Sequence, residues 1–201
     1  MIFLRYENFK QYLTFYPVTS AILLIQFIIF GWMQLAGGST NMDTLLHFGA
    51  LYKSISSNPE WWRYFTSIFI HIGFEHLFFN SIGLFIFAPP LEKMLGKWMY
   101  MLFYLGSGFA GNAFSQWLHT TGYIAAGASG AIFGIYAAYL YMALFRKDLV
   151  DQDSKKTILI IFIIGIVYSL VTPHVNIYAH IGGAIGGFVL LWLMEKRIAL
   201  K

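Results

Sequence analysis

Long apolar stretches separated by short polar connections dominate the chain. Six of them approach the roughly 20 residues that a helix needs to cross a bilayer. The fifth stretch is short and ends at Pro173, so at about 1.5 Å per residue it covers about 24 Å. The pattern predicts an all-α polytopic membrane protein, a six-transmembrane-helix bundle forming one domain over residues 1–201. The stretches lie near residues 15–36, 64–89, 98–118, 124–145, 157–172 and 175–194.

The composition supports a membrane protein. Hydrophobic residues make up 58% of the chain and charged residues 11%, against roughly half and a quarter in soluble domains. A soluble core of this size cannot bury that excess, so lipid must be the solvent. The first apolar stretch lacks a clear cleavage signature and is interpreted as a retained span. The absence of cysteine excludes disulfides, thiolate metal sites and a cysteine nucleophile.

The distribution of basic residues predicts the orientation in the membrane. With a cytoplasmic N-terminus, only Lys53 and Arg63 of the 13 Lys and Arg residues fall outside, as the positive-inside rule requires. We therefore expect both termini in the cytoplasm and the long connection, residues 37–63, on the external side. The basic residues flank apolar stretches instead of clustering with stacking aromatics, so no nucleic-acid partner is expected.

Three polar residues on different predicted helices fall at one depth. His76, Ser129 and His180 lie about 22–26 Å above the charged cytoplasmic ends of their helices, at about 1.5 Å per residue. In a hydrocarbon core of about 30 Å this is just below the external surface. Polar residues at such a depth face the protein interior or a wet cavity. Helix packing or a backbone hydrogen bond explains each residue alone, but their shared depth favours a site.

The residue types at this depth indicate nucleophilic chemistry. A serine hydroxyl becomes a good nucleophile when a histidine takes its proton. Of the nine acidic residues only Glu75 approaches this level, and as the neighbour of His76 it points to a different helix face. The others are placed in connections or tails. The sequence therefore favours a Ser129–His180 dyad, with Phe133, four residues after the serine, able to stack on the imidazole.

Acyl transfer also needs hydrogen-bond donors for the developing oxyanion. His76 and Asn80 are four residues apart and share a helix face, and the backbone N–H of Ser129 at a helix start is a third candidate donor. The alternative for the His76–Asn80 pair is a metal or a water. Only His71 is near enough to add a ligand, so no metal is expected.

Glycines four residues apart predict close helix contacts. Plain helix packing explains these pairs as well as a catalytic role does, and the two interpretations are compatible. The segment GSGFAG, residues 106–111, matches a dinucleotide-binding pattern, but it lies inside an apolar helix rather than after a strand. We interpret it as helix packing and expect no cofactor. The pairs are Gly130 and Gly134, Gly182 and Gly186, and Gly183 and Gly187.

Together these motifs resemble the rhomboid family of intramembrane serine proteases. The chain matches the family's G-x-S-G at Gly127–Gly130, its H-x-x-x-N at His76–Asn80 and its A-H-x-x-G-x-x-x-G at Ala179–Gly187. A tryptophan–arginine pair in the first external loop corresponds to Trp62–Arg63. Each motif alone is loose, but four in the right order on the right helices are specific.

The resemblance implies a minimal bacterial-type enzyme that cleaves transmembrane protein substrates in or near the lipid bilayer. Ser129 is the implied nucleophile, His180 the general base, and His76 and Asn80 with the Ser129 amide the oxyanion donors. The family's fifth helix and the following loop, here around Val171–Tyr178, are implied to move when substrate enters. The sequence does not reveal the oligomeric state or the physiological substrate. Residues expected to support the site are Gly127, Gly130, Phe133, Gly183 and Gly187.

Two other functional classes remain open from the residues alone. One is a small transporter that uses His71, His76 and His180 as proton relays, although transporters usually place polar groups at the midplane in paired repeats. The other is a catalytically inactive membrane chaperone or adaptor built on the same bundle. Reaction with a serine-directed reagent separates the protease from both.

Overall fold

The computed structural model describes residues 2–54, 58–120, 122–172 and 175–198, which are mostly helical. The six long helices are α2 (Pro17–Leu35), α5 (Phe74–Leu95), α6 (Lys97–Leu118), α7 (Ser129–Phe145), α8 (Gln152–Val171) and α9 (Ile177–Ile198). The shorter elements are α1 (Phe9–Phe15), α3 (Met42–Phe48), α4 (Arg63–Thr66), a 3₁₀ turn (Ser67–Phe69) and two strands, β1 (Leu51–Lys53) and β2 (Tyr123–Ala125). The expected all-α polytopic fold is confirmed.

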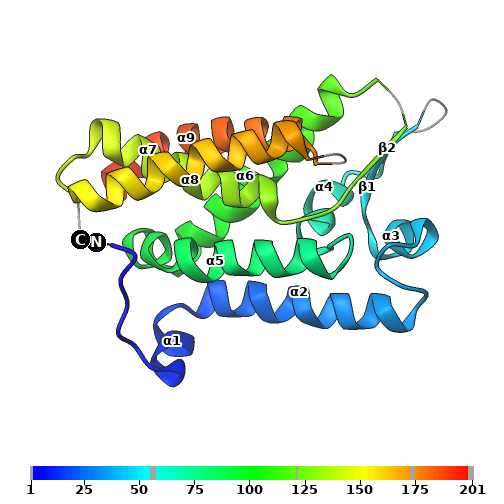
Figure 1. Ribbon diagram of the computed structural model, residues 1–201, viewed down its shortest axis with the longest axis horizontal. Helices are drawn as coiled ribbons and strands as arrows, with labels where there is room; N and C mark the ends of the chain where they lie inside the picture. Colours follow the sequence, from blue (N-terminus) through cyan, green and yellow to red (C-terminus); the bar gives the residue numbers. More distant parts are fainter. Residues whose placement is uncertain (1, 55–57, 121, 173–174, 199–201) are drawn as a thin grey trace.

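The long helices are arranged around α6, α7 and α9, which make the most extensive mutual contacts. Figure 1 shows α2 and α5 side by side, with α7, α8 and α9 together above them and α6 running between. Four tyrosine and phenylalanine rings from α6 and α7 are fully enclosed in the main core. They are Tyr100, Phe103, Tyr104 and Tyr139.

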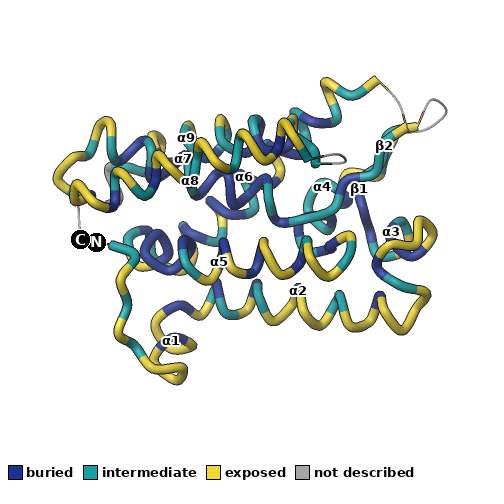
Figure 2. The backbone as a smooth tube through the Cα atoms, in the orientation of Figure 1, coloured by how far each residue is buried: buried dark blue, intermediate teal, exposed yellow. Residues whose placement is uncertain are grey.

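Large apolar side chains cover much of the outside, as they should where lipid is the solvent. Figure 2 shows α2 and α8 with long exposed faces, where Leu24 is 61% and Ile163 59% exposed. Among the described residues, α2, α5, α8 and α9 as far as Glu195 are long and apolar enough to cross a membrane, and α7 is a shorter apolar helix. The protein is therefore a multi-pass membrane protein.

Three predicted helix boundaries were wrong. The stretch 64–89 is not one helix, because α4 and the 3₁₀ turn occupy Arg63–Phe69 and α5 begins after Gly73, which has a φ of +79°. The stretch 124–145 starts as β2, and its helix begins at Ser129. The fifth helix is longer than expected, with 20 residues, because the Asp151 side chain accepts from the backbone N–H of Ser154 at 3.0 Å and caps the helix upstream. Pro173 lies outside the described residues.

Strands β1 and β2 form a two-stranded antiparallel sheet that the sequence did not predict. Leu51 pairs with Ala125, and Lys53 pairs with Tyr123. The pairing fixes the segment that leads into α7 against the loop before α4 (Figure 1). It therefore restrains the chain directly before Ser129.

The sequence places Glu92 at the charged cytoplasmic end of its helix, and the structure shows that it is only 2% exposed. Its carboxylate accepts from the backbone N–H groups of Val18 and Thr19, both at 2.8 Å, and from the Thr19 hydroxyl at 2.6 Å. The residue that precedes α2, Tyr16, provides no side-chain cap. Glu92 therefore caps α2 from a neighbouring helix and joins α2 to α5.

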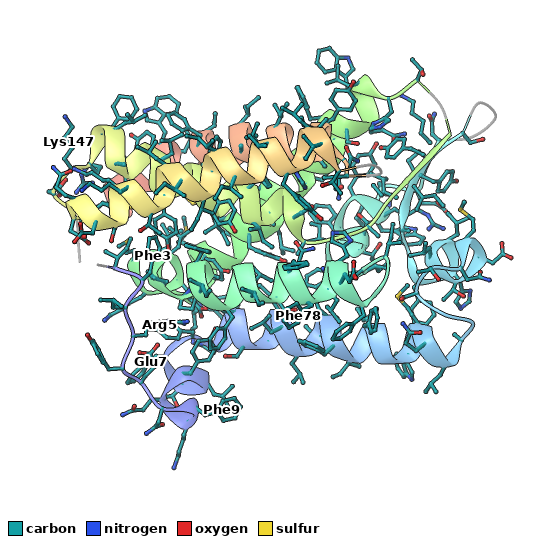
Figure 3. All side chains as sticks on the ribbon, in the orientation of Figure 1. Phe3, Arg5, Glu7, Phe9, Phe78 and Lys147 are labelled. Carbon is teal, nitrogen blue, oxygen red and sulfur yellow. The ribbon has the colours of Figure 1, made fainter. Side chains whose placement is uncertain are left out.

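Charged side chains gather at the end of the bundle away from the sheet. Figure 3 shows Arg5, Glu7 and Lys147 there, with Phe78 on the side of α5 that faces α2. Arg146, at the end of α7, donates to Asp148 at 2.9 Å, and this bond lowers the pKa of the Asp148 carboxyl. The two ends of the bundle thus differ in charge and in structure.

Candidate active site

Helices α5, α7 and α9 all begin at the end of the bundle that carries the sheet (Figure 1). His76 lies in the first turn of α5, Ser129 is the first residue of α7, and His180 lies in the first turn of α9. Ser129 and His76 are partly exposed, whereas His180 is 5% exposed. The structure thus places all three predicted polar residues at the same end of the fold.

Glycines hold α7 and α9 in backbone contact, as their spacing predicts. A Cβ atom added to Gly183 would clash with the carbonyl oxygen of Gly130, and one added to Gly187 would clash with the backbone of Gly134. A Cβ at Gly130 would lie 3.3 Å from the carbonyl oxygen of Ala179. Because Ala179 precedes His180 and Gly130 follows Ser129, this contact brings the neighbourhoods of the two residues together.

His180 is held on two sides. Its ring stacks on Phe133, with centroids 4.2 Å apart and planes inclined by 11°. Its Nδ1 lies 2.6 Å from the hydroxyl oxygen of Ser169, a residue that we did not single out from the sequence. In the described part of the chain His180 and Ser129 are not hydrogen-bonded to each other. Such bonds are often long before substrate binds.

The ring of His76 lies against the backbone of Gly127. A Cβ at Gly127 would approach the His76 Cε1 to 2.5 Å and its Nε2 to 2.7 Å, and Gly127 has a φ of +141°. Its N–H donates to the carbonyl oxygen of Ser67 at 2.8 Å. The first glycine of the G-x-S-G motif is therefore required both by its backbone conformation and by the adjacent imidazole.

Asn80 is buried one turn below His76, on the same face of α5. Its Nδ2 donates to the carbonyl oxygen of His76 at 2.8 Å. An amide carries two N–H donors, so the second can serve another acceptor. Glu75 is exposed and takes no part in this arrangement.

His71 lies beside the site, although its role was left open by the sequence. It is 1% exposed, and its Nε2 accepts from the backbone N–H of Ala128 at 3.4 Å. Its ring centroid is 5.2 Å from that of His76, at 75°. Since Ala128 directly precedes Ser129, His71 orients the segment that leads into α7.

Arg63 organises the loop above the site. It donates to the carbonyl oxygens of Leu46 at 2.7 Å and Ala50 at 3.0 Å, and its guanidinium lies 4.4 Å from the centre of the Trp62 ring. Its Nε donates to Glu60 at 2.6 Å, and this bond lowers the pKa of the Glu60 carboxyl. The tryptophan–arginine pair therefore ties together the loop that contains α3 and β1.

A family model for the rhomboid domain matches residues 58–197, which hold all the residues described above for the site except Leu46 and Ala50. The chain belongs to the rhomboid family. Its expected membership is thereby confirmed.

Similar proteins align with between 73% and 98% of this rhomboid. The protein named "Putative rhomboid protease YdcA" of Bacillus subtilis (strain 168) is 40% identical over 198 residues, 98% of each chain. Rhomboid protease GluP of the same strain is 38% identical over 170 residues, 85% of this chain and 33% of GluP. RHOMBOID-like protein 1 of Arabidopsis thaliana is 36% identical over 149 residues, 73% of this chain and 38% of that protein. These relatives confirm the expected enzyme class, a rhomboid-type serine protease.

Proposed function

We propose that this rhomboid cleaves peptide bonds in or near transmembrane segments through a Ser129–His180 dyad. His180 removes the hydroxyl proton of Ser129, the oxygen attacks the carbonyl carbon of the substrate, and the imidazolium then protonates the leaving amine. The observation that carries the proposal is the backbone contact of Gly130 with Ala179 and Gly183, since it brings together the residues next to the nucleophile and next to the base.

His76, Asn80 and the backbone N–H of Ser129 supply the oxyanion donors in this proposal. The fit of the His76 ring against Gly127 supports it, because it sets the imidazole beside the loop that precedes the nucleophile. The N–H of Ser129 belongs to the first turn of α7, where backbone donors have no partner within the helix. Phe133 supports the base, and Gly127, Gly130, Gly183 and Gly187 keep the helices close.

The substrates are single-span or multi-span membrane proteins, cut near the external face. The charged end with Arg5 and Lys147 (Figure 3) is assigned to the cytoplasm by the positive-inside rule, and the site lies at the opposite end. Both termini are then cytoplasmic. Substrate segments that contain Gly or Pro near the outer surface should be cut fastest, because these two residues favour local unwinding of a helix.

Purified protein in detergent and a model single-span substrate test the dyad. Ser129→Ala and His180→Ala should each lower kcat by about 10⁴-fold or more, with unchanged thermal unfolding. Ser81→Ala is the matched control, since Ser81 is a buried serine on α5 outside the dyad. Full activity of Ser129→Ala would reject the dyad.

A serine-directed fluorophosphonate separates the protease from the other classes. The parent should be labelled at Ser129, and Ser129→Ala should not. A transporter or an inactive adaptor would not react with the reagent. Absence of labelling in the parent protein would therefore contradict the proposal.

A further inference from the structure

We propose that Ser169 is a positioning residue that holds His180 in the tautomer needed for a general base. Ser169 lies on α8 and His180 on α9, and both side chains are 5% exposed. The inference rests on the proposed function, because it describes how the base of that dyad is prepared.

The hydrogen bonds of Ser169 determine where the imidazole proton lies. The Ser169 hydroxyl oxygen is 2.6 Å from the carbonyl oxygen of Gly165 and 2.6 Å from Nδ1 of His180. A hydroxyl has a single hydrogen, and a carbonyl oxygen can only accept. The hydroxyl therefore donates to Gly165, and Nδ1–H of His180 donates to the hydroxyl oxygen. Any other arrangement leaves one of these short contacts without a proton.

A proton on Nδ1 leaves Nε2 with its lone pair free. In a neutral imidazole one nitrogen donates and the other accepts. A base that takes a proton from Ser129 must present its accepting nitrogen to the hydroxyl. By keeping the proton on Nδ1, Ser169 leaves Nε2 as that acceptor. In serine proteases with a triad, a carboxylate performs the same service; here, among the described residues, the Nδ1 partner is a hydroxyl.

The surrounding contacts keep this arrangement rigid. Phe133 of α7 covers one face of the His180 ring. The same phenyl ring lies against Gly165, where an added Cβ would approach the Phe133 Cζ to 2.8 Å. Gly165, Ser169, Phe133 and His180 thus form one cluster of three helices. The tautomer of the base depends on the placement of α8 as well as of α9.

The test combines kinetics with the tautomer itself. Ser169→Ala should lower kcat roughly tenfold to a hundredfold, the effect of removing the hydrogen-bond partner that orients a metal-bound histidine, with an unchanged KM. Ser169→Thr retains the hydroxyl and should restore most of the rate. Thr157→Ala is the matched control, because the Thr157 hydroxyl also donates to a carbonyl four residues earlier on α8, at 2.9 Å, in an exposed position; it should not change kcat.

The tautomer is measured by ¹⁵N NMR of histidine-labelled protein carrying Ser129→Ala, so that no activity is needed. His180 should have its proton on Nδ1, and addition of Ser169→Ala should shift the proton toward Nε2. A proton on Nε2 in the presence of Ser169 overturns the inference, whether or not the protein cuts its substrate. An unchanged kcat in Ser169→Ala overturns it too. The inference also fails if Ser169→Ala and Ser169→Thr lose the same kcat and the same thermal stability. Failure of the dyad itself appears separately, as retained activity in Ser129→Ala.

Discussion

The imidazole of His76 occupies the space that any side chain at position 127 would need. The Gly127 Cα is thereby in contact with the ring, and its φ of +141° is one that residues with a Cβ rarely adopt. Two independent constraints therefore act at the glycine that lies two residues before Ser129.

Gly127→Ala should lower kcat by about 10²-fold or more. The added methyl displaces His76, and removal of one oxyanion donor alone costs about 10²–10³ in rate. Initial rates on the model substrate provide the measurement. Gly122→Ala is the control, since Gly122 has a φ of +71° and nothing within 4 Å of an added Cβ. It carries the backbone strain without the clash, and an equal loss of rate in both variants would contradict the assignment.

Gly183→Ala should destabilise the protein by about 1–3 kcal/mol or more, the cost of overpacking, because the new methyl meets the backbone of α7 at Gly130. Thermal unfolding in detergent measures this. Gly31→Ala on α2 is the matched control. Nothing lies within 4 Å of a Cβ there, and alanine favours a helix over glycine by about 1 kcal/mol, so Gly31→Ala should be neutral or stabilising. A neutral Gly183→Ala would show that α7 and α9 can separate freely.

Phe133→Leu should lower kcat about twofold to tenfold. Leucine keeps the site apolar but cannot stack on His180, and such ring pairs contribute about 0.5–1.5 kcal/mol. The rate of cleavage at saturating substrate is the measurement. Phe162→Leu removes a ring 6.2 Å from that of Phe133 without direct stacking on the histidine. If both variants lose the same rate, packing and not stacking is responsible.

Glu92→Gln should destabilise the protein by about 1–3 kcal/mol, since hydrogen bonds to a charged acceptor are the stronger ones. The amide replaces one of the two carboxylate oxygens that accept from α2 with a donor. Glu75→Gln, an exposed position on the same helix, should leave unfolding unchanged. Equal unfolding temperatures for the two variants would remove the proposed link between α2 and α5.

Glu60 should make the loop that precedes α4 sensitive to acid. Arg63 lowers the pKa of the folded-state carboxyl, so the stabilisation is present above the unfolded-state pKa and is lost as pH falls through the folded-state value. The difference in unfolding temperature between the parent and Glu60→Gln should therefore shrink as pH is lowered from about 7 to about 3. The Asp148–Arg146 pair is common to both proteins and cancels. A constant difference over this range would exclude the Glu60 carboxylate as its source.

Local spacing was sufficient to predict several contacts of the candidate site. His76 and Asn80 share a face of α5, and Phe133 lies one turn after Ser129 on α7, where its ring stacks on His180. The sequence predicted both because residues four apart share a helix face. Two of the glycine pairs, Gly130–Gly134 and Gly183–Gly187, likewise mark where α7 and α9 touch, whereas Gly182 and Gly186 face α6. In each case the deciding residues lie within one turn or two of the same helix.

The relations that were missed join distant segments. Ser169 meets His180 only once the rotation of α8 about its axis is known, and nothing in the apolar pattern of α8 specifies that rotation. Glu92 looked like an ordinary charged helix end, yet its partners lie on α2, more than 70 residues away. The pairing of β1 with β2 involves three residues on each strand, too few for an alternating pattern to stand out.

Direct backbone contact between α7 and α9 makes the two helices one mechanical unit. Bilayers of different thickness change the tilt of transmembrane helices, but a change in tilt would carry both helices together. The distance between alcohol and imidazole should accordingly be insensitive to lipid chain length, while the depth at which a substrate meets them should shift with it.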